Sequence, residues 1–474
     1  MVGPGAAGRG PAQEAVAAAL ERAAAVAHLN AFITLDAEGA GAEAARHDRR
    51  GDGARRWCLA VKDNIHVAGL PNTAGTPGLA GFVPAADAPV VAALRAAGAI
   101  VLGKTNMHEL ALGVTSGNPT FGAVGNGADP ALFAGGSSGG TAAAVASGVV
   151  DAGLGTDTGG SVGIPAALNG IYGLRPTAGR YPSAGVTPLS VTRDTPGPMA
   201  RTLVRLAALD AFVTGLFLTD RFLTDRTGAA PPPDRTLRLG LPRHVFTEDL
   251  EAPVLAAWEA AVDRLAGART VLVPVDTGHL VEYDARAGMH LVLGEFAAAL
   301  DRYLARHRVG RGTTEVVDAA ADPAVAELLR TAALPAGPAY AGPAALRGAV
   351  VERRAMQAAY AELFAVSGVD AILSPTVPVC ARPLHRHEES LPLNGREVPT
   401  FPTLIRNTSP SATAGLPSVT VPLPVDGSPP VGLQLVGPRG GDRELLAVAA
   451  RVDALLRRGD GGGRGGGVPV SPPR

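Results

Sequence analysis

Short apolar runs alternate with helix-like segments along most of the chain, and this alternation constrains the fold more than any other feature. The strand-like runs are residues 59–61, 99–102, 237–241, 270–275 and 371–373. Segments rich in Ala, Leu, Glu and Arg separate them. Strands that alternate with helices predict an α/β fold, in which helices cover both faces of a twisted mixed β-sheet.

The length of 474 residues suits a single large α/β domain. We expect this domain to span residues 13–458, with a helical excursion from the sheet at about 237–364. Residues 1–12 are rich in Gly and Pro, which predicts a flexible N-terminus. Residues 459–474 (GDGGGRGGGVPVSPPR) form a low-complexity stretch, so we expect a disordered tail.

Charge and composition exclude several classes of partner. The 42 Lys and Arg residues nearly balance 43 Asp and Glu residues, so the formal net charge is −1. This balance favours neither nucleic acid nor a membrane surface as a partner. The sequence shows no secretory signal and no continuous apolar run of the ~20 residues that a spanning helix needs. Two cysteines, Cys58 and Cys380, in so long a chain suggest reduced thiols and a cytoplasmic protein.

Two segments rich in glycine and serine are the strongest functional signal. They are residues 135–140 (GGSSGG) and 155–161 (GTDTGGS). A folded protein keeps such glycine density where the backbone needs unusual dihedral angles or approaches a ligand closely. A loop of this kind that ends in a serine can present a nucleophile together with backbone N–H groups for an oxyanion. The alternative is that both segments are flexible loops without a catalytic role. The presence of two such segments with a lysine upstream argues against this alternative.

That lysine is Lys62, which directly follows the apolar run at 59–61. A lysine removed from water has a lowered pKa and can be neutral near pH 7, as a general base must be. The alternative is a lysine that reaches from a strand end to solvent and pairs with Asp63.

Two short motifs point to other chemistry. Residues 98–105 (GAIVLGKT) match a P-loop expression, but their interior is a strand-like apolar run, so we reject a phosphate loop. Residues 135–139 (GGSSG) match the nucleophile elbow of α/β-hydrolases. That elbow requires a strand immediately before it, whereas residues 127–134 are loop-like. An α/β-hydrolase esterase that uses Ser137 or Ser138 with a histidine therefore stays an alternative.

Taken together, the chain resembles the amidase signature family. The resemblance runs through residues 57–64, 103–110 (GKTNMHEL), the two Gly/Ser segments, 415–424 (GLPSVTVPLP) and 432–437 (GLQLVG). It implies the amidase signature fold, with a signature core at about 57–210. Within the family the chain looks most like mandelamide and indoleacetamide hydrolases, which cleave primary amides of aryl-substituted acetic acids to the acid and ammonia.

The resemblance implies a Ser–cis-Ser–Lys triad and an acyl-enzyme. In this sequence Ser161 would be the nucleophile, Ser137 the bridging serine in a cis peptide, and Lys62 the base. The implied oxyanion hole consists of backbone N–H groups, those of Thr158, Gly159, Gly160 and Ser161. The implied loop support comes from three further residues, Gly136, Ser138 and Asp157. No metal or organic cofactor is implied; the partner is a small-molecule amide, and a homodimer is an option.

The chain departs from the family pattern at three positions. Gly163 stands where the family has an arginine, and Leu132 and Ala134 stand where members often have Arg and Pro. Without the arginine at 163, we expect Asp157 to lack a charged partner. These departures keep a second hypothesis open, a catalytically weakened binding or assembly subunit with the same fold.

Two other pairs are ambiguous in the sequence. His108 and Glu109 could form an acid/base pair or begin a helix that packs on the core. Arg193 and Asp194 could shape the substrate pocket or pair with each other on a loop.

Overall fold

A computed structural model describes residues 9–51, 56–215, 235–267, 269–386, 389–423, 425 and 427–457. Residues 1–8 of the predicted flexible N-terminus and the predicted tail at 459–474 lie outside the described residues. The first helix, α1 (Pro11–Ala25), begins two residues before the predicted start of the domain. No helix in these described ranges is both long and apolar enough to cross a membrane.

The core is one sheet of eleven strands in the order β1-β3-β2-β4-β6-β5-β12-β13-β9-β7-β8. All five strand-like runs of the sequence lie in this sheet, as parts of β2, β3, β7, β8 and β9. The strand pairs are parallel around β2 and β7 and antiparallel elsewhere, so the sheet is mixed. The strands are β1 (Phe32–Leu35), β2 (Trp57–Lys62), β3 (Ala99–Thr105), β4 (Ala152–Asp157), β5 (Tyr172–Arg175), β6 (Thr195–Ala200), β7 (Leu237–Pro242), β8 (Thr270–Val275), β9 (Ala371–Pro375), β12 (Ser418–Leu423) and β13 (Val431–Val436). A separate hairpin joins β10 (Ser390–Leu393) to β11 (Arg396–Pro399).

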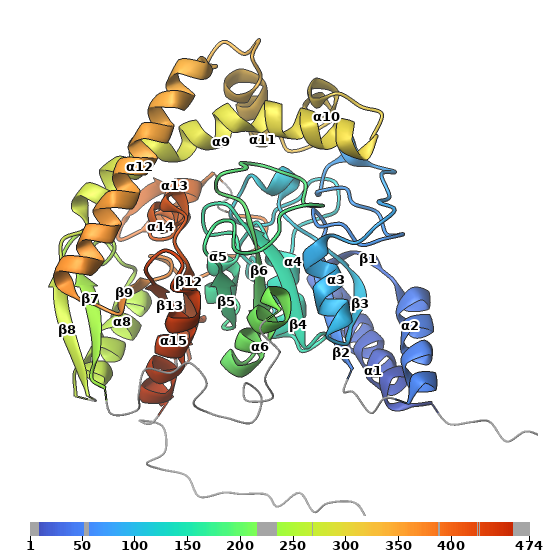
Figure 1. The fold of residues 1–474 in the computed structure, drawn as a ribbon, viewed down its shortest axis with the longest axis horizontal. Helices are drawn as coiled ribbons and strands as arrows, with labels where there is room; N and C mark the ends of the chain where they lie inside the picture. The colour runs from blue at the N-terminus through green and yellow to red at the C-terminus, as the bar shows by residue number, and fades with distance from the viewer. Residues whose placement is uncertain are drawn as a thin grey trace, which may run out of the picture.

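Helices cover both faces of this sheet, as predicted (Figure 1). Alternate residues of β2 show why: Cys58 and Ala60 pack into one apolar cluster, whereas Leu59 and Val61 pack into another on the opposite face. The first cluster includes helices α1, α2 (Ala37–Arg50), α4 (Gly139–Ala146) and part of α5 (Gly163–Leu168). The second includes α3 (Pro89–Ala96), α6 (Leu203–Thr214), α8 (Ala252–Ala266) and α15 (Asp442–Arg457).

A group of helices follows the strand β8 and arches over one end of the sheet (Figure 1). The predicted helical excursion at 237–364 therefore starts later, at Gly278, because β7 and β8 join the main sheet. This group comprises α9 (Gly278–His307), α10 (Thr313–Asp318), α11 (Pro323–Leu328), a π-helical turn (Leu329–Ala333) and α12 (Gly342–Ser367). Two short helices, α13 (Thr400–Ile405) and α14 (Ser409–Ala414), precede β12, and three 3₁₀ turns lie at Ala27–Leu29, Pro77–Leu79 and Glu109–Ala111.

The rejected P-loop segment is a buried strand. Its residues from Ala99 to Thr105 form β3, and all of them are buried. Lys104 of this segment lies 3.4 Å from the Asp63 carboxylate and donates to Pro71 O at 2.9 Å. The lysine is therefore a structural cation inside the fold. Cys58 and Cys380 are both buried, as free cysteines.

Candidate active site

The predicted catalytic residues converge where β2 and β4 end. These strands are parallel neighbours, with Val61 opposite Leu154. Their carboxyl ends therefore meet at one edge of the sheet, where β2 ends at Lys62 and β4 at Asp157. The chain then forms the loop 158–162 before α5 begins at Gly163.

Lys62 is fully buried at this edge. Its Nζ lies 2.7 Å from Ser137 Oγ and 2.8 Å from Thr156 Oγ1. Burial lowers the pKa of this amine from 10.5 to about 7, and the nearby carboxylates of Asp157 and Asp194 oppose the shift. The structure thus excludes the alternative of a lysine reaching to solvent. Thr156, which the sequence analysis missed, is the second partner of the amine.

The first Gly/Ser loop brings Ser137 to the lysine. The peptide bond between Gly136 and Ser137 is cis, as the family resemblance implied. A Cβ atom on Gly136 would lie 2.9 Å from Ser116 N, so only glycine fits here. Ser138 joins the two loops, because its N–H donates to Ser161 O at 3.3 Å and its Oγ donates to Thr156 O at 3.1 Å.

Asp157 has partners despite the glycine at position 163. Its carboxylate accepts the N–H groups of Gly160 at 2.9 Å and Val162 at 2.8 Å, and it forms an ion pair with Arg175 at 2.7 Å. The expectation that Asp157 lacks a charged partner was therefore wrong. Arg175 ends β5, which is distant in sequence but reaches Asp157 through the sheet, so the local motif did not reveal it.

The predicted oxyanion donors form the turn after β4. Gly160 adopts a φ of 133°, and a Cβ atom there would lie 2.1 Å from Thr408 Oγ1, so this position requires glycine. The Gly160 N–H already donates to Asp157 Oδ1. Its predicted role as an oxyanion donor therefore requires that this N–H be shared between two acceptors.

A cavity of about 40 Å³ lies beside Ser161. It adjoins a wider hollow of about 760 Å³, with which it shares wall residues that include Met289 and Phe401. The inner wall is mostly apolar, with the Arg193 side chain as a charged exception. Its residues from distant segments, which sequence reasoning could not assign, are Met289, Val292, Phe401 and Ile405.

The two ambiguous pairs are resolved differently. His108 and Glu109 do not act as a pair: Glu109 accepts the backbone N–H of Asp322, whereas the His108 ring lies 3.4 Å from the Asp322 carboxylate. Arg193 lines the cavity at Ser161, and Asp194 accepts the Thr158 hydroxyl at 2.6 Å.

Comparison with known proteins supplies the class. A family model described as Amidase matches residues 14–446. The chain is 37% identical to an indoleacetamide hydrolase of Allorhizobium ampelinum, covering 94% of this chain and 95% of that protein. It is 36% identical to a mandelamide hydrolase of Pseudomonas putida, with coverage of 94% and 89%. The solved structure of a native peptide amidase from Stenotrophomonas maltophilia superposes with a TM-score of 0.76 at 30% identity, with 94% of each chain covered.

The α/β fold and these matches define a hydrolase that acts on amides. The chain belongs to the amidase family, the amidase signature family that its two Gly/Ser segments indicated.

Proposed function

We propose that the chain hydrolyses primary amides of aryl-substituted acetic acids through Lys62, Ser137 and Ser161. The observation that carries this proposal is the contact of 2.7 Å between Lys62 Nζ and Ser137 Oγ, two groups that are both fully buried. With a pKa of about 7, about half of the buried amine is neutral at pH 7 and can accept a proton.

The proposed reaction has two halves. Ser161 Oγ attacks the amide carbonyl carbon while its proton passes to Ser137 Oγ, and the Ser137 proton passes to Lys62 Nζ. The C–N bond then breaks, and the proton returns through Ser137 to the leaving nitrogen, which departs as ammonia. Water attacks the resulting ester at Ser161 by the same relay and releases the carboxylic acid.

Backbone N–H groups of the turn after β4 stabilise the oxyanion in this proposal. They belong to Thr158, Gly159 and Ser161, with Gly160 as a shared donor because of its bond to Asp157. One donor of this kind typically contributes about 3 kcal/mol of transition-state stabilisation. The loop support assigned to Gly136, Ser138 and Asp157 agrees with the contacts that each of them makes.

The proposed preference for an aryl-substituted acyl group is supported by the apolar cavity wall and by the names of two relatives. The wall beside Ser161 offers Leu112, Ile164, Val292 and Phe401 to an apolar group. An aryl ring on the acyl side would bury its apolar surface against these side chains. The names of the two curated relatives, indoleacetamide and mandelamide hydrolase, point to the same class of acid. A cytoplasmic location, a homodimer and the absence of nucleic-acid partners remain predictions from the sequence.

The two alternative functions have less support. The weakened assembly subunit rested on the departures at Gly163, Leu132 and Ala134, and for Gly163 the side chain of Arg175 supplies the charge that Asp157 was expected to lack. The esterase hypothesis requires a histidine beside Ser137 or Ser138. Ser137 Oγ contacts Lys62 instead, and Ser138 Oγ contacts Thr156 O.

Ammonia release from phenylacetamide, mandelamide and indoleacetamide tests the proposal. We expect Ser161→Ala and Lys62→Met each to lower kcat/KM by at least about 10³-fold, because both remove a member of one proton-transfer unit. Ser147→Ala is the matched control: its hydroxyl donates to Ala143 O at the end of α4, and its kcat/KM should stay within twofold of the wild type.

Hydroxylamine capture tests the acyl-enzyme separately. Phenylacetamide and methyl phenylacetate carry the same acyl group. If both form the same acyl-enzyme, hydroxylamine should give the same ratio of hydroxamate to acid from each of them. Activity that survives Ser161→Ala would refute the mechanism. A folded wild type that cleaves no amide of the panel would instead support the assembly subunit.

A further inference from the structure

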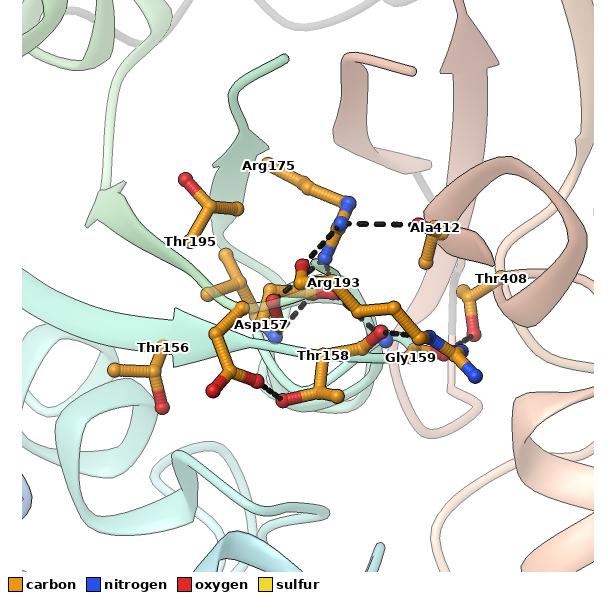
Figure 2. Close-up of polar contacts among 12 residues, drawn as sticks. Thr156, Asp157, Thr158, Gly159, Arg175, Arg193, Thr195, Thr408 and Ala412 are labelled. Carbon is orange, nitrogen blue, oxygen red and sulfur yellow. Dashed lines mark hydrogen bonds and ion pairs between the residues drawn. The ribbon is translucent and has the colours of Figure 1, made fainter. Parts of the chain in front are cut away.

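Three successive carbonyl groups, at the end of β4 and in the turn that follows it, are held by donors from other parts of the fold. Figure 2 shows Arg175 and Arg193 approaching this segment, with Thr408 beside Gly159. The three bonds run from Arg175 Nη1 to Asp157 O at 2.6 Å, from Arg193 Nε to Thr158 O at 3.0 Å, and from Thr408 Oγ1 to Gly159 O at 2.7 Å.

Each of these carbonyls shares a planar peptide unit with the N–H of the next residue. In a trans peptide the C=O and N–H bonds point in opposite directions, so a donor that holds the carbonyl also fixes the direction of the N–H. The Thr158 carbonyl thereby orients the Gly159 N–H. A cationic donor also polarises the peptide unit, which strengthens the N–H as a hydrogen-bond donor.

We propose that Arg193 is a positioning residue, which aims and polarises the Gly159 N–H toward the oxyanion formed at Ser161. This inference rests on the proposed function, because it assigns Gly159 to the oxyanion hole of that reaction. We assign the effect to the Gly159 N–H because the N–H of the neighbouring Gly160 already donates to Asp157.

Every nitrogen of the Arg193 side chain has a separate partner. Besides Thr158 O, the guanidinium donates to Gly288 O of α9 at 2.7 Å and to Ser409 Oγ of α14 at 3.2 Å. Arg175 Nη2 holds the Arg193 carbonyl at 2.6 Å. The side chain is 2% exposed, so these bonds form in a site where water does not replace them.

This arrangement is specific for arginine. The guanidinium presents its N–H groups in a fixed planar fork, whereas a lysine ammonium is a single point of donation on a flexible stem. Arg193 therefore links the oxyanion turn to two helices at once. One of them, α9, also supplies Met289 and Val292 to the cavity wall.

The test compares two ligands that differ only in whether Ser161 converts them to an oxyanion. Benzyl trifluoromethyl ketone forms a tetrahedral adduct with a serine nucleophile, and benzyl methyl ketone binds as the intact ketone. We expect Arg193→Gln to lower kcat for phenylacetamide and the affinity for the trifluoromethyl ketone by about 10- to 100-fold each. KM and the affinity for the methyl ketone should change less than about threefold, because Arg193 acts on the developing charge.

Arg238→Gln is the matched control, since Arg238 also donates to two backbone carbonyls, those of Ser367 and Gly368, at the end of α12. It should leave both affinities within twofold of the wild type. Arg193→Lys keeps the charge but not the fork, and we expect a loss smaller than that of Arg193→Gln. If Arg193→Gln does not fold, Ser409→Ala removes one tether alone, and the trifluoromethyl ketone affinity should fall about two- to fivefold.

The outcomes separate the two proposals. If Arg193→Gln or, in its place, Ser409→Ala weakens both ketones equally or neither of them, the role of Arg193 is refuted. If Ser161→Ala binds the trifluoromethyl ketone as tightly as the wild type does, the proposed function itself is refuted, and the role of Arg193 with it.

Discussion

Replacing Lys62 with methionine should change the pH dependence of stability in a direction that the buried site determines. Burial lowers the pKa of this amine from 10.5 to about 7 in the folded chain. Between these two values the unfolded chain binds a proton that the folded chain does not, so the free energy of unfolding rises with pH. Below about pH 7 the fold carries the full cost of a buried ammonium, and above 10.5 that cost is absent.

The magnitude follows from linkage. One pKa unit corresponds to about 1.4 kcal/mol, and integration from pH 7 to pH 9 gives a rise of about 2 kcal/mol from Lys62 alone. Lys62→Met removes this contribution while keeping an apolar side chain of similar length. It also leaves the hydroxyls of Ser137 and Thr156 without the amine, at about 1–3 kcal/mol each. These hydroxyls do not titrate in this range, so their loss shifts the stability of the variant without changing its slope with pH.

Urea denaturation at pH 7 and pH 9 measures the effect. The stability of the wild type minus that of Lys62→Met should increase by about 2 kcal/mol between the two pH values. Other buried groups, such as Lys104 and Asp63, contribute equally to both proteins and cancel. Ser147→Ala retains Lys62 and should follow the wild type. A constant difference between wild type and Lys62→Met at both pH values would refute the claim that burial holds the Lys62 pKa near 7.

The remaining predictions concern rate, stability and specificity. The kcat/KM for phenylacetamide should fall about tenfold per pH unit below about pH 7, because protonated Lys62 cannot act as the base; a flat profile from pH 5.5 to 8.5 would contradict this. Asp157→Asn should lower the free energy of unfolding by about 3–5 kcal/mol in urea titrations, since it leaves the buried Arg175 without its carboxylate; a loss below about 1 kcal/mol would argue against that ion pair. Phe401→Ala should widen the cavity and raise the kcat/KM ratio of 1-naphthylacetamide to phenylacetamide about tenfold in ammonia-release assays, and an unchanged ratio would place the aryl group elsewhere.

The sequence predicted the layers of the fold well because strand signals are local. Each of the five apolar runs became part of a strand, since a buried strand needs only a few consecutive apolar residues. The strands that were missed carry weaker local patterns. For example, β6 (Thr195–Ala200, TPGPMA) contains two prolines and a glycine, and it forms only because β4 and β5 flank it.

The site was predictable only where its residues lie in motifs. Lys62 and the two Gly/Ser loops stand in segments whose composition is unusual, and the structure brings them to one edge of the sheet. Thr156 lies in the second of these segments, but nothing there marks it as a partner of Lys62, and Arg175 and Phe401 lie in no such segment. Their roles depend on the pairing of β4 with its neighbours and on where α13 packs, and both follow from long-range contacts.

The charges around Ser161 illustrate why the departure at Gly163 misled the sequence interpretation. Asp157 and Asp194 both raise the pKa of Lys62, so without compensation they would favour the charged amine that cannot act as a base. Burial outweighs this effect on the amine. Arg175 lies against Asp157 and pairs the charge of this buried carboxylate. The same guanidinium holds the Asp157 carbonyl behind the oxyanion turn. A cation is therefore required beside Asp157 for two reasons, but neither reason requires that the cation come from position 163. Any segment that the sheet brings to the end of β4 can supply it, and in this chain β5 does so through Arg175.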